Sequence, residues 1–344
     1  MLCAAFEPLN SLIPSMIRFQ LAPVCHASSV FVDHVDALAC RVIVCTHAPQ
    51  KTVVGAAAIA IAIAGGRGLI GDSRYQAEIA EWRKNYDRDL RSEKGPLWLI
   101  ARHTVAEGRI EIGSDTSNSI KLPDRAPKRI GAFERRSDKV TFVPAAGIAV
   151  NLNGKPMTGP AVLRTGVAPD PRDRIQFGDF EVIVTALDGN CQLAVRDRQS
   201  PLLKTFRGAL WFPVNAGYRV EAAFTPYPQP KELKIPDTSG RIRTRQVPGY
   251  VTFQLNGDTM RLEPIATGNE LFFMFKDRTS GRETYGAGRY LDTEMPKNGK
   301  VVLDFNKAYN PYCALNPNSS CPIPPKQNTL LTRVEAGEKH RGEH

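Results

Sequence analysis

The stretch YVTFQLNGDTMRLEPI at residues 250–265 alternates apolar and polar side chains on both sides of Asn256-Gly257. A period of two lets an extended strand bury one face and leave the other in water. An Asn-Gly pair accepts the positive φ angles of a tight two-residue turn, so the stretch predicts a β-hairpin. Further strands are predicted within 270–277 (ELFFMFKD) and 299–305 (GKVVLDF). We therefore expect residues 201–338 to form a β-rich domain, either a curved sheet or a barrel.

The region upstream of this domain carries short strand-like segments separated by turn residues. Asn153-Gly154 and Asp188-Gly189 mark tight hairpins, and no helical stretch interrupts the pattern. Many short strands in a row are typical of a β-sandwich. Ten segments are predicted as strands: 97–102, 109–114, 119–123, 129–135, 139–144, 148–152, 161–164, 174–178, 180–186 and 191–197.

An amphipathic helix is predicted at residues 73–91. Ser73 and Gln76 have the spacing of a capping box, which indicates a helix start. Apolar residues then recur at steps of three and four through a charged background. This stripe needs a partner, and we expect it to pack on the β-sandwich, so that residues 72–200 form one domain. The stripe consists of Tyr75, Ile79, Trp82, Tyr86 and Leu90.

The segment from about 224 to 249 is rich in Pro, Thr and charged residues. Such composition is typical of a surface connection, and we predict an extended loop there.

The first 71 residues differ from the rest. An uncharged apolar run, TVVGAAAIAIAIAGG, follows Lys51. It is too short for an ordinary membrane span but has the length of a signal-peptide core, with Ala62-Ile63-Ala64 as a cleavage box. About fifty residues precede it, so we interpret residues 1–71 as a signal-like segment or a mis-called extension, with the true translation start near Val42 or Val44.

This interpretation predicts an exported protein, periplasmic or extracellular. Membrane contact is expected only through the apolar segment 51–66, as an N-terminal anchor if it stays uncleaved. The alternative is a buried Ala/Ile helix in a cytoplasmic protein. At the other end, residues 339–344 read as a short tail.

Charge and ligand residues exclude several classes of function. Lys and Arg number 45 against 35 Asp and Glu, a net charge of +10, but they are spread thinly. No dense basic run indicates a nucleic-acid groove. There is no C-x-x-C, and His103 is the only histidine between residue 72 and the tail. We therefore predict no metal site and no cofactor.

Two polar, glycine-punctuated segments, 276–292 and 304–325, follow predicted strands of the second domain. Loops held by a rigid sheet are where binding sites tend to form, and we expect the two segments to lie together. Arg289 follows Gly286-Ala287-Gly288 and is either an anion ligand or the buried partner of Asp304 or Glu283. The candidate ligand-binding residues are Glu283, Tyr285, Arg289, Asp304, Asn306, Tyr309 and Asn310.

Cys313 and Cys321 lie in the second of these segments and leave three alternatives open. The Pro- and Asn-rich residues between them can fold back, so a disulfide is reasonable in an exported protein. Two separately buried thiols are the second alternative. A reactive or metal-binding pair is the third, although soft thiolates need further ligands that the sequence lacks.

Two family resemblances extend this picture. The pieces 112–124, 151–159 and 173–182 resemble the forkhead-associated sandwich in spacing and turns. That family grips phosphothreonine with an arginine after its first glycine and with a serine and a histidine on the next strand. Here Ser114 follows Gly113, and Lys128 and Gly131 stand at the other two positions. The resemblance implies the fold, whereas phosphopeptide binding is not expected.

The second resemblance covers roughly Tyr75 to Glu338. FFMFKDRTSGRETYGAGRYL, LDFNKAYNPYCALNPNSSCPIPP, Asn328 and the final VEAGE resemble the bacterial family called domain of unknown function 1684, and WRKNYDRDLR fits it as well. The resemblance implies that members are commonly exported, and it implies no established activity.

Three functions follow as hypotheses. The first is an exported, non-catalytic protein that binds a small ligand or an envelope partner at the C-terminal loops. The second is a hydrolase-type enzyme that uses Glu283, Asp304, Tyr285 or Arg289. The third is a structural protein-interaction module built on the sandwich.

Overall fold

The structure is a computed structural model that describes residues 29–36, 39–45 and 64–342, apart from 167–170 and 188–189. The chain divides into two compact units, residues 1–62 and 63–344. In the first unit, β1 (Ser29–Asp36) pairs antiparallel with β2 (Ala39–Cys45). Most of the signal-like run, residues 51–63, lies outside the described residues. Among the described helices, none has the length and apolar character needed to cross a membrane.

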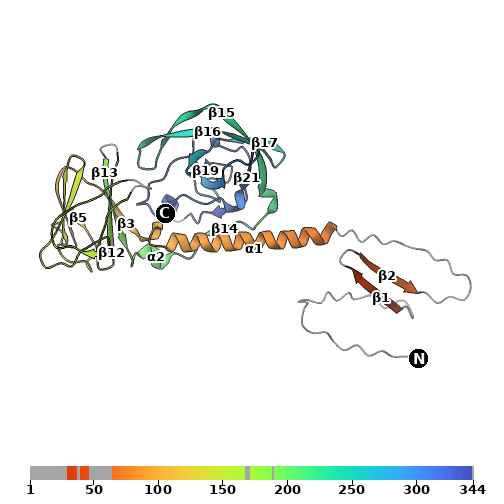
Figure 1. Ribbon diagram of the computed structural model, residues 1–344, viewed down its shortest axis with the longest axis horizontal. Coiled ribbons are helices and arrows are strands. Elements are labelled where there is room, and N and C mark those ends of the chain that lie inside the picture. The colour runs from red at the N-terminus through yellow and green to blue at the C-terminus, as the bar shows by residue number, and fades with distance from the viewer. Residues whose placement is uncertain (1–28, 37–38, 46–63, 167–170, 188–189, 343–344) are drawn as a thin grey trace, which may run out of the picture. The chain divides into compact units, whose positions relative to one another are not determined.

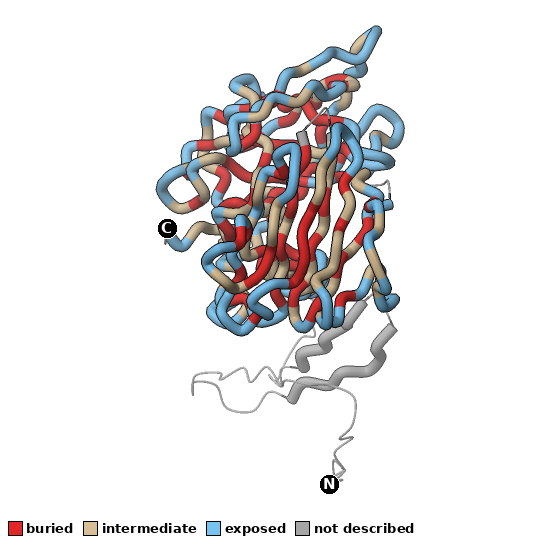
Figure 2. The backbone as a smooth tube through the Cα atoms, turned by 90° about the vertical axis from the view of Figure 1, so that its left-hand side faces the viewer, coloured by how far each residue is buried: buried red, intermediate tan, exposed pale blue. Residues whose placement is uncertain are grey.

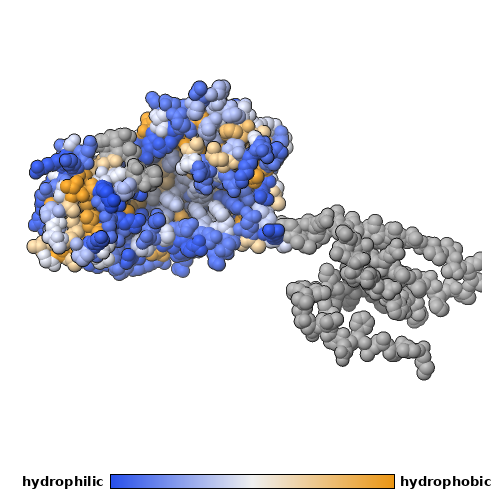
Figure 3. Space-filling view, in the orientation of Figure 1, coloured by the Kyte–Doolittle hydropathy of each residue, from blue (hydrophilic) through white to orange (hydrophobic). Residues whose placement is uncertain are grey.

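The second unit begins with α1 (Ala64–Arg91), the long helix of Figure 1. The predicted start at Ser73 is wrong, because the helix continues upstream and places Ser73 in its interior. A capping-box pattern marks a helix end only where the preceding residues are not helical. Along α1 the face shown in Figure 3 is largely hydrophilic.

The buried stripe of α1 does not pack mainly on the sandwich, which corrects the sequence-based expectation. Tyr75 donates a hydrogen bond to Asp304 in the second β-rich region, over 2.7 Å. Tyr86 contacts Tyr309, with ring centroids 5.5 Å apart, and Trp82 contacts Trp211. The helix pattern showed which face is buried, but it held no information about the partner surface.

Residues 96–197 form two antiparallel-rich sheets around one apolar core. One sheet has the order β10-β7-β6-β4-β5 and the other β3-β13-β12-β11-β8-β9. Both contribute to the core, for example through Phe133 and Phe142 of the first and Val182 and Leu193 of the second. Figure 2 shows buried residues alternating with intermediate ones along the strands. Each of the ten predicted segments contains a strand, so a mainly β region is confirmed. After η1 (Pro96–Trp98) the strands are β3 (Leu99–Thr104), β4 (Gly108–Gly113), β5 (Ile120–Lys121), β6 (Gly131–Arg136), β7 (Lys139–Pro144), β8 (Asn151–Leu152), β9 (Lys155–Pro156), β10 (Ala161–Val162), β11 (Arg174–Phe177), β12 (Phe180–Leu187) and β13 (Asn190–Asp197).

The second β-rich region is built from open sheets, and no sheet of the described residues closes into a barrel. A four-stranded sheet has the order β17-β16-β15-β21, and a three-stranded sheet has the order β18-β19-β20. The predicted hairpin is present: Leu255 pairs with Asp258, and Asn256 and Gly257 have φ angles of 53° and 88°. The elements are α2 (Pro201–Thr205), β14 (Leu210–Trp211), η2 (Ala216–Tyr218), β15 (Arg219–Pro236), β16 (Ile242–Leu255), β17 (Asp258–Leu262), β18 (Ile265–Thr267), β19 (Glu270–Phe275), β20 (Arg289–Glu294), β21 (Lys300–Asp304), η3 (Phe305–Lys307), η4 (Tyr312–Ala314), η5 (Lys326–Asn328) and β22 (Glu338–Lys339).

The loop predicted at 224–249 is instead the long hairpin of β15 and β16 (Figure 1), so that prediction is wrong. The strands pair from Ala223 to Pro226 and again from Lys231 to Pro236. The register shifts between Pro226 and Lys231, so the prolines there need not donate to the ladder. Proline therefore interrupted the pairing locally without ending the strand.

Residues 305–337, called here the C-terminal strap, contain only short 3₁₀ turns and bridges. Buried asparagines of the strap donate to backbone carbonyls of the neighbouring elements and so give those carbonyls a partner. Asn316 Nδ2 donates to the carbonyls of Pro96 and Leu99, at 2.8 and 2.7 Å. Asn328 donates to the carbonyls of Glu263 and Met274. The asparagines of the strap therefore replace a strand ladder.

Candidate functional site

The two polar segments predicted to lie together do meet. The backbones of Tyr290 and Tyr309 exchange two hydrogen bonds of 2.8 and 2.9 Å. The Tyr290 hydroxyl also donates to the Pro322 carbonyl at 2.5 Å. The strap is therefore fixed against the start of β20. This strand directly follows Gly286-Ala287-Gly288, called here the glycine-flanked loop.

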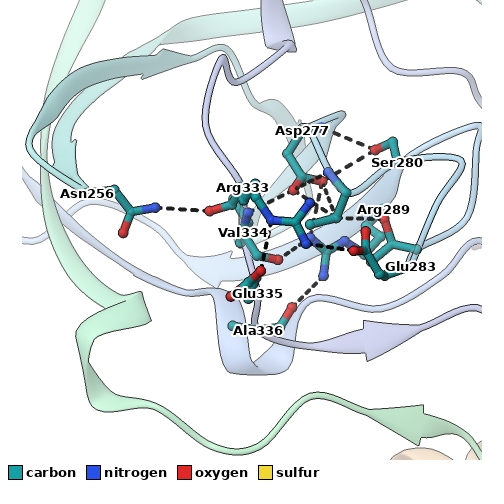
Figure 4. Close-up of polar contacts among 11 residues, drawn as sticks. Asn256, Asp277, Ser280, Glu283, Arg289, Arg333, Val334, Glu335 and Ala336 are labelled. Carbon is teal, nitrogen blue, oxygen red and sulfur yellow. Dashed lines mark hydrogen bonds and ion pairs between the residues drawn. The ribbon is translucent and has the colours of Figure 1, made fainter.

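Arg289 has a structural partner that the sequence analysis did not name. Its side chain is fully buried, and its guanidinium donates to Asp277 at 3.2 Å and to the carbonyls of Val334 and Ala336 (Figure 4). The expected partners Asp304 and Glu283 are therefore wrong. Asp277 lies just after β19 and 12 residues before Arg289, and sequence spacing gave no reason to prefer it.

Most of the other candidate residues also pair with separate partners. Glu283 forms an ion pair with Arg333 at 2.7 Å near the surface. Asp304 accepts from Tyr75, and the Asn306 amide donates to the same tyrosine at 3.0 Å. The carboxyl groups of Glu283 and Asp304 therefore belong to different clusters.

Tyr309, in the strap, and Tyr285, in the segment before β20, pack against the same small apolar cluster. The Tyr309 hydroxyl donates to Asp292 Oδ2 at 2.7 Å. The Tyr285 ring lies edge-on to His340, with centroids 5.1 Å apart, and burial is the main cause that raises the pKa of Tyr285 to about 12. Both phenols keep their protons at neutral pH, so they are hydrogen-bond donors.

Asn310 is the candidate that lines an open cavity. A cleft of about 520 Å³, called here the C-terminal cleft, lies between α2, the loop that follows it, the strap and the segment that begins with β22. Three residues with a permanent positive charge line it, and one acidic residue does. Its lining residues are Leu97, Leu202, Thr205, Phe206, Arg207, Gly208, Ala209, Leu210, Asn310, Ala314, Leu315, Glu338, Lys339, His340 and Arg341.

Glu338 is that acidic residue, and the sequence analysis missed it as a functional residue. Its side chain is 1% exposed, and its Oε2 accepts from the Asn310 backbone N–H at 2.7 Å and from the Tyr86 hydroxyl at 3.1 Å. Burial outweighs these hydrogen bonds and raises its pKa to about 7. A carboxyl group with such a pKa in a cleft is a recognised sign of a functional site. Only the VEAGE motif in the printed sequence marks this position.

The Asn310 side chain completes the floor of the cleft. Its amide nitrogen donates to the Lys339 carbonyl at 3.0 Å, and it lies in hydrogen-bonding contact with the Glu338 carboxyl. Its Oδ1 is buried and has no hydrogen-bond partner within the described part of the chain. A buried amide oxygen without a donor is costly, and a protonated Glu338 can supply that donor. The orphaned oxygen and the raised pKa therefore point to the same protonation state.

A second depression, lined by Lys231, Arg261, Glu263 and Gln327 among others, has different chemistry. Glu263 accepts hydrogen bonds from Tyr227, Lys231, Arg261 and Gln327. Although burial alone would raise its pKa, the hydrogen bonds from Tyr227, Gln327 and Lys231 lower the pKa to about 2. Its cations are already paired, so this depression offers a ligand little.

Cys313 and Cys321 are free, buried thiols in the structure. The Cys313 backbone N–H donates to the Cys321 sulfur at 3.2 Å, so the two residues are in direct contact. No cluster of three or more His, Cys, Asp or Glu side chains suited to a metal ion occurs in the described ranges.

A solved structure and a family model each match part of this chain. No curated protein matches. A solved structure, the solution NMR structure of an uncharacterized protein from Haloarcula marismortui, is 34% identical, covers 41% of this chain and 80% of that chain, and has a TM-score of 0.36. Residues 204–339 match the family model described as protein of unknown function (DUF1684), and through this region the chain belongs to that family.

Proposed function

We propose that this protein binds a small anionic molecule in the C-terminal cleft and does not transform it. The observation that carries the proposal is the buried pair of Glu338 and Asn310 at the floor of a cleft of about 520 Å³. The pair places polar groups at the floor of a cleft whose walls are largely apolar, and a few convergent polar groups are how small-molecule sites fix orientation.

The rim supports an anionic ligand. Arg207, Lys339 and Arg341 line the cleft, and Glu338 is the only carboxylate among the lining residues. Because its pKa is near 7, Glu338 is about half protonated at neutral pH, which leaves the cleft net positive. Arginine side chains favour carboxylate and phosphate groups.

The walls support a ligand with an apolar part. Leu97, Leu202, Phe206 and Leu315 line the same cleft. A mostly apolar cavity with a few convergent polar groups is the usual form of a small-ligand site.

The hydrolase alternative has less support. It relies on Glu283, Asp304, Tyr285 or Arg289, whereas Arg289 is bound to Asp277, Glu283 to Arg333 and Asp304 to Tyr75. An acid and a base that are engaged in separate clusters cannot flank one scissile bond.

The cellular setting in this proposal is export, to the periplasm or outside the cell. The signal-like composition of residues 51–66 supports it. The predicted envelope partner and the forkhead-associated-like identity of the sandwich remain predictions.

A thermal-shift screen of the full chain against small carboxylates and phosphates, with and without apolar groups, tests the proposal. Thr205 is exposed and lines the cleft, so Thr205→Trp fills it, whereas Lys204→Trp adds the same bulk to α2 outside the cleft. At least one anion is expected to stabilise the wild type and the Lys204 variant but not the Thr205 variant. Failure of every anion on the wild type, or an unchanged shift in Thr205→Trp, would overturn the proposal.

A further inference from the structure

The residues that line the C-terminal cleft divide into an apolar side and a polar side according to the elements that carry them. The apolar side is built by η1, α2, η4 and the residues that directly follow α2 and η4. It consists of Leu97, Leu202, Phe206, Ala314 and Leu315. The polar side is built by the loop after α2, by the strap and by the segment that begins with β22. It consists of Arg207, Asn310, Glu338, Lys339, His340 and Arg341.

The apolar side is held in place by hydrogen bonds of its own. The Asn316 amide donates to the Pro96 carbonyl at 2.8 Å and so fixes η1 beside the strap. The Phe206 N–H donates to the Leu202 carbonyl at 2.9 Å, which closes the end of α2. The Arg91 guanidinium lies 4.8 Å from the centre of the Phe206 ring and donates to the Phe206 carbonyl at 3.0 Å. The apolar surface is therefore preformed, as it is in most small-ligand sites.

The positive charges of the polar side have no partner of opposite charge. Arg207, Lys339 and Arg341 form no ion pair with any other residue that the structure describes. The carboxyl of Glu338, the one acidic lining residue, instead accepts from the Asn310 N–H at 2.7 Å. Three positive charges thus face the cleft with no anion to balance them.

These two sides place opposite demands on a ligand. A compact inorganic anion would meet the positive charges but would leave the apolar side in water. An uncharged hydrocarbon would cover the apolar side but would leave the positive charges without a partner. A hydrocarbon chain with an oxyanion at one end meets both demands, because burial of apolar surface and charge-assisted hydrogen bonds then stabilise the same complex.

We propose that the C-terminal cleft binds single-chain amphiphiles, which are molecules with one hydrocarbon chain and one terminal carboxylate or phosphate group. This inference rests on the proposed function and makes it specific by naming the class of ligand. The chain lies along the apolar side, and the oxyanion lies against Arg207, Lys339 and Arg341. The pair of Glu338 and Asn310 belongs to the oxyanion end, because Lys339 follows Glu338 and the Asn310 amide donates to the Lys339 carbonyl at 3.0 Å.

Isothermal titration calorimetry of the full chain tests the ligand class, with straight-chain alkanoates from acetate to decanoate kept below their micelle-forming concentrations. Affinity is expected to rise about fourfold with each added methylene until the chain fills the cleft. Octanol and octylamine carry the same chain with a neutral or a positive end, and each should bind about tenfold or more weakly than octanoate. The tighter ligand of octanoate and octyl phosphate identifies the preferred oxyanion.

Two variants locate the two ends of the ligand. Arg207→Gln should weaken octanoate binding about tenfold and leave octanol binding unchanged. Lys204→Gln removes the same charge from α2 outside the cleft and is the matched control, with no effect expected on octanoate. Leu202→Ala should lower the affinity for octanoate but not for acetate, because only the longer chain reaches this side chain.

The outcomes separate this inference from the proposed function. If acetate or inorganic phosphate binds as tightly as octanoate, the cleft accepts anions without reading a chain, so the inference fails while the proposed function stands. If octanol binds as tightly as octanoate, or if no compound binds, both fail. Octanoate binding that persists in Thr205→Trp would place the ligand outside the cleft and would also overturn both.

Discussion

The Arg289 guanidinium lies 3.2 Å from Asp277 Oδ1, and both side chains are fully buried. Asp277 also accepts from the Val334 N–H at 2.8 Å, and Arg289 donates to the Val334 carbonyl at 2.9 Å. One ion pair therefore fixes the residues just before Glu338 to the loop that follows β19. The position of the cleft floor depends on this pair.

Replacing Arg289 by methionine is expected to destabilise the protein strongly. The change leaves Asp277 buried without its cation and frees the carbonyls of Val334 and Ala336. Breaking one side of a buried ion pair costs about 3–5 kcal/mol of unfolding free energy. Urea unfolding under reducing conditions measures this loss.

Arg333→Ala is the matched control for this prediction. Arg333 forms ion pairs with Glu283 and Glu335 at the surface, close to the same site (Figure 4). Exposed pairs contribute little, so this variant should unfold almost as the wild type does. Equal losses in the two variants would show that the buried pair is not the main connection.

The pH dependence of stability should report Glu338. Its folded pKa of about 7 lies above the ordinary 4.5, so between these values the folded protein binds the proton more tightly than the unfolded chain. The free energy of unfolding therefore falls as pH rises through this window and stays lower above it, by about 3 kcal/mol. Tyr86, Asp87 and Arg289 are the other titratable groups that act on Glu338.

Glu338→Gln isolates this contribution. Glutamine can still accept from Tyr86 and from the Asn310 N–H, but it does not titrate. Unfolding curves at acid and mildly alkaline pH should show a smaller loss of stability for this variant than for the wild type. Parallel losses in both proteins would contradict a buried carboxyl that holds its proton.

Asn316→Ala should loosen the strap from the first sheet region. The substitution leaves the carbonyls of Pro96 and Leu99 without the Asn316 amide, and buried unpaired groups of this kind cost about 1–3 kcal/mol. Urea unfolding measures the loss. Ser320→Ala, which removes exposed hydroxyl contacts with Ser239 and Asp237, is the control and should have a smaller effect. Similar stability of both variants would mean that the amide contacts do not hold the strap.

The sequence predicted the sheets well wherever the deciding interaction was local. Asn153-Gly154 and Asn256-Gly257 both adopt the positive φ angles that their dipeptides favour. The proline-rich start of the long hairpin was misread, because a register shift accommodates residues that cannot donate to a ladder. Composition alone cannot show whether a proline lies at a paired or an unpaired position.

The candidate site was harder to predict because its properties arise from distant residues. Asn310 was found from the polar character of the strap, yet the partner that gives it meaning, Glu338, lies 28 residues later. Burial sets the pKa of Glu338, and this burial arises where α1, through Tyr86, and the strap, through Asn310, meet the Glu338 carboxyl. Arg289 shows the same limit. Packing decides that it pairs with Asp277 and not with Glu283 or Asp304, and the sequence does not show that packing.

Gly288→Ala should disturb the junction between the glycine-flanked loop and the strap. Gly288 has φ of +107°, and an added Cβ would lie 2.5 Å from the Phe275 carbonyl oxygen and 2.7 Å from a Pro324 side-chain carbon. The unfavourable backbone and the overlap together should cost about 2–4 kcal/mol.

Gly281→Ala is the matched control: its φ is also positive, +79°, but the nearest atom to an added Cβ is 3.9 Å away. We expect it to lose only the backbone contribution, about 1–2 kcal/mol. Thermal or urea unfolding separates the two, and equal losses would mean that the close approach of Pro324 does not constrain this loop.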